Sequence, residues 1–311
     1  MHPRPALLLA VPLALALVAC GVATATPKPT PGPTAAPAPA AAPSVQVEVV
    51  ATGLDTPWAI DQAPDGRIFL TERPGRIRIL RNGQLDPEPW LALDVAEVGE
   101  GGLLGLALDP DFTQNRYVYV AYTYQGEGGR LLNRLERLVE DPATGRGRRD
   151  GILLDGAAGA SIHNAGRVRF GPDAKLYWSV GDANDSALAQ DTASLNGKIL
   201  RLNADGSVPA DNPLGGSPVY AYGLRDPQGL AWQPGTGRFY ATDHGPTAQD
   251  EVDQIMPGAN YGWPEVTGAE ERSGFEPPVI QSGADTWAPA GVAFVTRGPW
   301  AGSLLFAGLR G

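Results

Sequence analysis

Cysteine and histidine are scarce in this chain of 311 residues, which contains one cysteine and three histidines. A single cysteine excludes a disulfide within the chain, whatever the redox state of its compartment. Basic residues are also few, since 24 Lys and Arg stand against 34 Asp and Glu, for a net charge of −10. This balance disfavours a nucleic-acid partner, because neutralising phosphates requires a basic surface. It is compatible with small neutral substrates and with bound cations.

Helical periodicity is missing from the body of the chain, where no long segment repeats its apolar residues every 3.6 positions. Glycine (40 residues) and proline (30 residues) are instead abundant, and they separate short strand-like runs of period two. With 43% hydrophobic residues, the chain can bury a core. The composition therefore predicts an all-β protein rich in turns.

The first 44 residues have the composition of an export signal followed by a linker. An apolar run from Ala6 to Ala19 follows Arg4 and is too short to span a bilayer as a mature helix, so residues 1–19 are interpreted as a signal peptide. The run ends in LVAC, which resembles the bacterial lipobox. Cys20 would then be lipidated and would anchor the exported protein to the cell-envelope membrane, on its periplasmic or extracellular face. The alternative is an incidental cysteine in an ordinary signal peptide. Residues 20–44, rich in Pro, Ala and Thr, predict a linker without a core.

One unit recurs over residues 45–311, which we take as the folded domain. Each copy has an apolar strand, a turn of Pro, Asp and Gly, and a second strand rich in aromatic residues; the copies are residues 57–80, 101–124, 166–182, 228–245 and, more weakly, 290–311. Repeats built only from strands and turns predict the blades of a β-propeller. A two-sheet sandwich is the alternative. Only five copies are visible, so we expect the last blade of a closed ring to be missing or truncated.

Both histidines of the folded domain lie in turns of the repeat. His163, in SIHNAG, precedes the first strand of the third unit, and His244, in ATDHGP, follows the second strand of the fourth. Loops on one face of a propeller commonly bind ligands. A neutral imidazole there is a competent general base. A surface or structural role is the alternative for each histidine.

Four segments carry a resemblance to a known family. In chain order they are GGLLGLALDPDF, HNAGRVRFGPDAKLYWSVGDAND, NGKILRLNADGSVPADNP and YAYGLRDPQGLAWQPGTGRFYATDHGPTAQDEVDQIMPGANYGWP. Together they resemble the soluble quinoprotein sugar dehydrogenases, that is, the glucose/sorbosone or aldose sugar dehydrogenases, from about Val47 to the last residue. The resemblance implies a six-bladed β-propeller that uses pyrroloquinoline quinone (PQQ) and calcium. It also implies oxidation of an aldose at its anomeric carbon to the lactone, with electrons passed to an external acceptor.

The same resemblance implies roles for individual residues. His163 would be the general base that takes the proton of the anomeric hydroxyl, and Arg225, in GLRDPQG, would contact the quinone oxygens. Gly245 and Pro246 would contribute backbone carbonyls to the calcium bound with the cofactor. Arg310, in GLRG, falls where the family has a basic residue near the cofactor.

A second calcium, with a structural role, is implied at Glu251 and the carbonyl region of Tyr261. The alternative reads Asp250, Glu251 and Asp253 as a solvated acidic turn. We favour the calcium interpretation, because GANYGW is an unusual low-charge aromatic loop at a matching distance from the acidic residues.

Three positions depart from the family pattern. Asp226 stands where the family has Asn, and Glu100 replaces a common glutamine, so both would bring a negative charge to a polyanionic cofactor. Ile162 precedes the histidine where one branch has Asp, so no carboxylate at that position orients the imidazole. Two rival functions therefore stay open: a calcium-dependent lactonase on a similar propeller, and a non-catalytic propeller that binds a carbohydrate or a protein.

Overall fold

The structure is a computed structural model that describes residues 46–310. The interpreted signal peptide and the whole linker, with Cys20, lie outside the described residues. Within residues 46–310, the helices are too short and too polar to cross a membrane.

Alternating apolar and polar residues, divided by tight turns, form antiparallel sheets in chain order. The first two sheets consist of β1 (Pro57–Gln62), β2 (Ile68–Glu72), β3 (Arg76–Arg81), β4 (Gln84–Leu85) and β5 (Leu91–Ala92), and of β6 (Leu103–Leu108), β7 (Tyr117–Gln125), β8 (Leu131–Glu140) and β9 (Gly147–Ala158).

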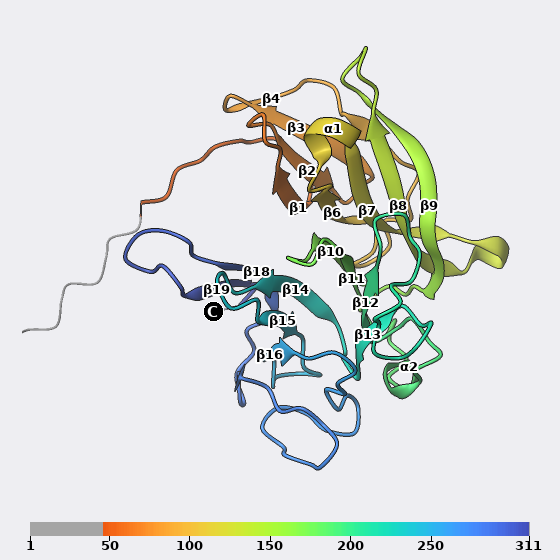
Figure 1. Ribbon diagram of the computed structural model, residues 1–311, viewed down its shortest axis with the longest axis vertical. Coiled ribbons are helices and arrows are strands. Elements are labelled where there is room, and N and C mark those ends of the chain that lie inside the picture. Colours follow the sequence, from red (N-terminus) through yellow and green to blue (C-terminus); the bar gives the residue numbers. More distant parts are fainter. Residues whose placement is uncertain (1–45, 311) are drawn as a thin grey trace, which may run out of the picture. The chain divides into compact units, whose positions relative to one another are not determined.

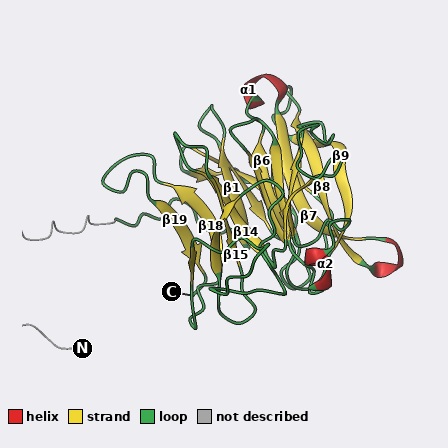
Figure 2. Ribbon diagram, turned by 60° about the horizontal axis from the view of Figure 1, so that its bottom comes forward, coloured by secondary structure: helices red, strands yellow, loops and turns green. Residues whose placement is uncertain are grey.

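The next three sheets repeat this arrangement. They consist of β10 (Ala165–Phe170), β11 (Leu176–Val180), β12 (Lys198–Leu202) and β13 (Val219–Tyr222); of β14 (Pro227–Trp232), β15 (Phe239–Asp243), β16 (Glu251–Ile255) and β17 (Ile280–Gln281); and of β18 (Pro289–Phe294) and β19 (Leu304–Gly308). The helices of the described residues are single turns: α1 (Phe112–Asn115), η1 (Glu127–Gly129) and α2 (Ala187–Gln190). Figure 2 shows how strands dominate this part of the chain.

The five repeat copies are confirmed, because each one contains the first two strands of a different sheet, and the first copy also contains most of β3. The first strand of each sheet packs against the first strand of the next: β1 on β6, β6 on β10, β10 on β14 and β14 on β18. Figure 1 shows the sheets following one another around an arc, as propeller blades do. The fold is an all-β propeller, and the sandwich alternative is wrong. In the residues described, the fifth sheet has two strands.

The core lies between neighbouring sheets and includes aromatic rings that pack edge to face. Phe69 and Trp90 make an edge contact at 5.5 Å between ring centres, as do Tyr177 and Phe239 at 5.2 Å. Tyr177 and Trp178 are 3% and 1% exposed, so both rings belong to the core rather than to an open ligand platform. Burying such side chains contributes about 1.5–3 kcal/mol each to stability.

Close approach of the inner strands depends on glycine. A Cβ on Gly105 of β6 would lie 2.0 Å from the carbonyl oxygen of Gly166 on β10, and Gly166 itself has φ of 100°. Any larger residue at either position would push these two strands apart. The loop before β10, which carries His163, is therefore placed within reach of the loop before β6.

Candidate active site on the propeller rim

His163 lies two residues before β10 in a strained turn. The φ angles of His163 and Ala165 are 58° and 51°, in the left-handed region that costs non-glycine residues about 1–2 kcal/mol each. Backbone hydrogen bonds hold the turn: His163 N donates to Glu100 Oε2 at 2.7 Å, and Ala165 N donates to Asp226 Oδ1 at 2.9 Å. Residues held in such conformations cluster at functional sites.

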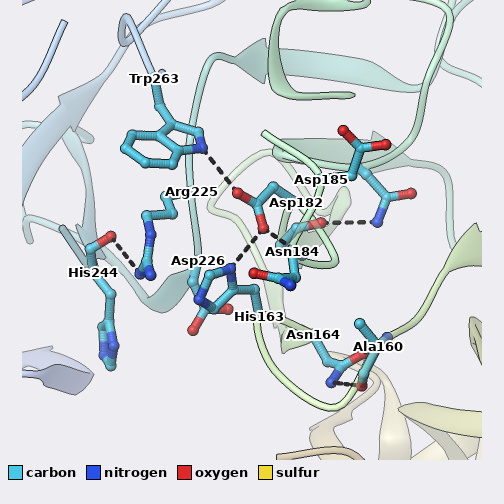
Figure 3. A network of polar contacts seen from close by, with 12 residues as sticks. Ala160, His163, Asn164, Asp182, Asn184, Asp185, Arg225, Asp226, His244 and Trp263 are labelled. Carbon is cyan, nitrogen blue, oxygen red and sulfur yellow. Dashed lines mark hydrogen bonds and ion pairs between the residues drawn. The ribbon is translucent and has the colours of Figure 1, made fainter. Parts of the chain in front are cut away.

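The imidazole of His163 is oriented by Asp182. His163 is 7% exposed, and its Nδ1 lies 2.7 Å from Asp182 Oδ1. Asp182 is fixed in turn by Trp263 Nε1 at 2.9 Å and by Asn184 N at 2.7 Å (Figure 3). A carboxylate at Nδ1 favours the tautomer with the proton on that nitrogen and leaves Nε2 with a free lone pair. His163 is therefore built to accept a proton at Nε2.

The expectation drawn from Ile162 needs correction. Although position 162 supplies no carboxylate, Asp182 supplies one from the loop after β11. Asp182 accepts a hydrogen bond from Asn184 N and so caps its own loop, and the same side chain also orients the histidine. The register of the β10–β11 hairpin could have revealed this contact. It pairs Ala165 with Val180, so His163, two residues before β10, and Asp182, two residues after β11, come together.

Arg225 occupies the loop before β14, next to this pair. Its backbone N and that of Asp226 donate to the two carboxylate oxygens of Asp243, at 2.8 and 2.6 Å. Its guanidinium donates to His244 O at 3.3 Å and lies 5.5 Å from the ring centre of Trp263. Because Trp263 also touches Asp182, one aromatic side chain links the arginine to the histidine–aspartate pair (Figure 3).

Glu100 and Asp226 have a structural use that sequence reasoning did not foresee. Each accepts a backbone hydrogen bond from the His163 turn, and Asp226, 2% exposed, also accepts from Gln228 Nε2 at 2.9 Å. Both side chains line a cavity of about 800 Å³ between the inner strands. Asp226 is turned toward these donors and does not line the small pocket described next. An amide oxygen could make the same backbone bonds without the charge.

Five of the predicted site residues surround one small pocket. It is lined by Arg225, Gly245, Pro246, Glu251 and Tyr261. The structure thus brings Arg225 together with the residues assigned by resemblance to the two calcium ions, whereas His163, Glu100 and Asp226 do not line this pocket.

Buried carboxylates lie beside this pocket on the fourth sheet. Glu251 and Asp253 share one face of β16, and Asp243 is the cross-strand neighbour of Glu251. Burial raises the pKa of Asp243 to about 6 and, with help from the charge of Asp243, that of Glu251 to about 8. Asp253 is 0% exposed, and burial and the nearby acids raise its pKa well above the usual value. The alternative of a solvated acidic turn is therefore wrong.

These donors fit a hard cation. Both carboxylate oxygens of Asp253 are buried and, within residues 46–310, have no hydrogen-bond partner. Unpaired buried charge is costly, and a calcium ion, which prefers oxygen ligands, would compensate it. Among the described residues no three His, Cys, Asp or Glu side chains converge as a complete metal site, so backbone carbonyls would have to supply further ligands.

Arg310 lies outside both pockets, whereas His244 lines both of them and uses its ring for a structural contact. Arg310 is exposed and lines neither the small pocket nor the large cavity; its backbone N donates to Trp287 O at 3.1 Å. His244 Nε2 lies 2.6 Å from Pro289 O, so this nitrogen donates and ties the fourth sheet to the fifth. The structural alternative describes His244 well.

Comparison with known proteins agrees with this geometry. The family model described as Glucose / Sorbosone dehydrogenase matches residues 54–311. The chain belongs to the glucose/sorbosone dehydrogenase family. It is 35% identical over 263 residues to quinoprotein glucose dehydrogenase B of Acinetobacter calcoaceticus, covering 73% of this chain and 54% of that relative. It is 34% identical over 243 residues to the aldose sugar dehydrogenase of Escherichia coli K12, covering 75% of this chain and 66% of that relative.

A solved structure of the same family has the same fold. The PQQ-bound aldose sugar dehydrogenase of Streptomyces coelicolor superposes with a TM-score of 0.77 at 39% identity, covering 85% of this chain and 78% of that one. The chain spans less than two thirds of the length of the two curated relatives named above. The residues matched by the family model, 54–311, include His163 and Arg225.

Proposed function

We propose that this protein is a quinoprotein oxidoreductase that oxidises an aldose at its anomeric carbon to the lactone, using PQQ and calcium. The observation that carries the proposal is the His163–Asp182 pair beside Arg225, on the rim of a propeller of the glucose/sorbosone dehydrogenase family. A histidine alone would fit many roles. A buried histidine with one ring nitrogen held by a carboxylate and the other free fits a general base.

The residues present fit the cofactor and its metal. Arg225 would contact the quinone oxygens, and the carbonyls of Gly245 and Pro246 would hold the calcium of the cofactor. Glu251 and the Tyr261 segment would hold a second calcium, next to the unpaired carboxylate of Asp253. When bound, the quinone would accept the two electrons and the hydrogen of the anomeric carbon, with calcium polarising its carbonyl.

The chain's own residues would manage the proton and the charge. His163 Nε2 takes the proton of the anomeric hydroxyl, and Asp182 stabilises the resulting imidazolium through Nδ1–H. Trp263 keeps Asp182 in place, and Arg225 stabilises negative charge that develops on the neighbouring oxygen atoms. General-base catalysis of this kind accelerates a reaction by about 10²–10⁴-fold.

Reconstitution tests the proposal. The apoprotein is loaded with Ca²⁺ and PQQ, dye reduction with glucose is followed, and the assay is repeated with His163→Ala. Dye reduction that is lost in the variant supports the proposal. Lactone hydrolysis without quinone would instead support the lactonase-type propeller. If neither dye reduction nor lactone hydrolysis is observed, a non-catalytic binding propeller is supported.

We further propose that the ring is six-bladed and that the exported chain is anchored to the envelope membrane through Cys20. Family membership supports the first statement, and the LVAC pattern after a short apolar run supports the second. Metabolic labelling with palmitate tests the anchor: the label should appear on the wild-type chain and vanish in Cys20→Ser.

A further inference from the structure

Trp263, whose indole N–H donates to Asp182, lies on a segment that crosses from the fourth sheet to the third. Residues 259–263 follow β16 in the chain, yet they lie against the end of β13, where Tyr222 forms an isolated parallel bridge with this segment. Trp263 N donates to Gly223 O at 2.9 Å. The position of Trp263 along this contact decides whether its ring reaches Asp182.

A pair of side-chain amides fixes the register of this contact. Gln190, the last residue of α2, donates from Nε2 to Asn260 Oδ1 at 3.0 Å, and Asn260 Nδ2 donates back to Gln190 Oε1 at 2.7 Å. Gln190 Nε2 also donates to Trp263 O at 2.6 Å, and because a carbonyl oxygen can only accept, the amide nitrogen must face it. Backbone bonds alone specify a register weakly, whereas Gln190 holds Trp263 both directly and through Asn260.

The chain leaves room for this amide pair at Gly223. A Cβ there would lie 2.1 Å from Asn260 Oδ1 and 2.9 Å from Gln190 Nε2, and the φ angle of Gly223 is 74°. A larger residue would therefore separate the two amides and would also be strained. Asn260 Oδ1 accepts a further hydrogen bond from Gly262 N at 3.0 Å, which fixes the amide on its own segment.

The turn that carries Gln190 is fixed by a buried lysine. Helix α2 is a single turn, which is too short to be stable by itself. Lys198 of β12 is 0% exposed, and its Nζ donates to Leu188 O at 2.8 Å, Ala189 O at 2.9 Å and Asn196 O at 2.6 Å. Because a buried ammonium is costly without such acceptors, the carbonyls of α2 stay around it and anchor Gln190 to the third sheet.

We propose that Gln190 is a positioning residue for the histidine of the rim. Gln190 fixes Trp263, Trp263 fixes Asp182, and Asp182 selects the tautomer of His163. Without the donor at Gln190, Trp263 moves away from Asp182 Oδ2, and this carboxylate, 1% exposed, then turns toward other donors. The consequence for catalysis rests on the proposed oxidoreductase function, whereas the effect on the imidazole does not.

The tautomer of His163 tests the proposal without any cofactor. The full-length apoprotein is labelled with ¹⁵N-histidine, and the imidazole ¹⁵N–¹H correlations are recorded at pH ~7.5, above the ordinary pKa of histidine. His163→Gln assigns the signals among the three histidines. We expect the neutral ring of His163 to carry its proton on Nδ1. In Gln190→Ala, the ratio of the Nε2–H form to the Nδ1–H form should rise by about fivefold or more, because the hydrogen bond to the carboxylate is loosened.

Two further variants separate hydrogen bonding from side-chain volume. Gln190→Glu keeps the size of the side chain and an acceptor for Asn260, but it cannot donate to Trp263 O, so it should shift the tautomer as Gln190→Ala does. Gln114→Ala removes an exposed glutamine from the other single-turn α-helix of the described residues, α1, and should keep the wild-type spectrum. Circular dichroism and the Tm of each variant establish that it is folded.

Dye reduction after loading with PQQ and Ca²⁺ provides the second measurement. We expect Gln190→Ala and Gln190→Glu to lower kcat by about fivefold with KM for glucose unchanged, because the base is misdirected while the sugar still binds.

The outcomes distinguish this proposal from the proposed function. An unchanged tautomer in either folded Gln190 variant, even with a lower Tm, would make Gln190 merely structural and overturn the proposal, as would a neutral wild-type ring of His163 protonated on Nε2. A shifted tautomer with wild-type kcat would overturn the link to catalysis. A shifted tautomer in a protein that reduces no dye would support the positioning role and contradict the proposed function alone.

Discussion

The two histidines of residues 46–310 lie on neighbouring sheets, and their ring nitrogens make opposite kinds of contact. His163 turns Nδ1 to the carboxylate of Asp182 and keeps Nε2 free. His244 Nε2 donates a hydrogen bond to the carbonyl oxygen of Pro289, because that oxygen can only accept. The His244 ring therefore joins two blades. The same residue type in equally turn-like sequence thus acquires a chemical role in one place and a structural role in the other. The hydrogen-bond partner decides which.

Repetition explains how the chemical residues meet. His163 and Arg225 hold the same position in the third and fourth repeats, each two residues before the inner strand of its sheet. Because the inner strands pack side by side, equivalent loop positions of successive blades converge on one rim. The histidine proposed as general base and the arginine beside it are therefore placed by the same structural repetition.

The difference between the two histidines is tested most directly by replacing each one with glutamine in the reconstituted protein. His163→Gln should lower kcat by about 10²–10⁴-fold, because the amide cannot take the hydroxyl proton. His244→Gln retains an N–H that can donate to Pro289 O, so kcat should change little. Steady-state dye reduction measures both. Equal losses in the two variants would show that His163 is not a base.

Asp182→Asn tests whether the partner, rather than the histidine alone, makes the difference. We expect kcat to fall by about 10- to 100-fold with KM little changed, because the ring loses its fixed tautomer and its counter-charge while the sugar still binds. Asp185→Asn, in the exposed part of the same turn, is the matched control and should behave as wild type. A parallel rise of KM and fall of Tm would instead assign Asp182 a purely structural role.

The buried carboxylates of the fourth sheet, which also positions His244, predict that calcium stabilises the folded protein. Calcium at 100 times its Kd should raise the free energy of unfolding of the full chain by about 2.7 kcal/mol, seen as a rise of Tm by several degrees. Asp253→Asn should lose most of this rise, because a buried unpaired carboxylate is removed. Asp205→Asn, on an exposed turn, should keep it. A calcium response identical in both variants would argue against a site at this face.

The smallest expected effect concerns the two carboxylates that hold the His163 turn. Glu100→Gln and Asp226→Asn keep an oxygen acceptor for the backbone and remove a negative charge. Each should therefore tighten quinone binding by about 1 kcal/mol, or roughly fivefold. Asp226→Ala loses the acceptor for Ala165 N and should lower kcat instead. Titration with quinone, followed by its absorbance, gives the affinities; weaker binding by the amide variants would show that the carboxylates assist the cofactor.

Much of the fold could be predicted from the sequence. Within residues 46–310, the five strand–turn–strand copies, the absence of long helices and the loop positions of His163 and His244 all follow from local patterns, and the structure confirms them. The site was predicted less completely. Asp182 and Trp263 were not assigned to it, Glu100 and Asp226 were expected near the cofactor without their role in the turn, and Arg310 lies exposed outside both cavities.

The sequence by itself determined the blades, because alternation of apolar residues and turn formation depend on neighbours only a few positions apart. Only the tertiary structure decided which atoms meet on the rim. Glu100 and the backbone of His163 are 63 residues apart, and Asp182 and Trp263 are 81 apart. Such partners are chosen by the packing of one blade against the next. A local pattern carries no record of that packing, so the chemistry of His163 becomes visible only in the folded chain.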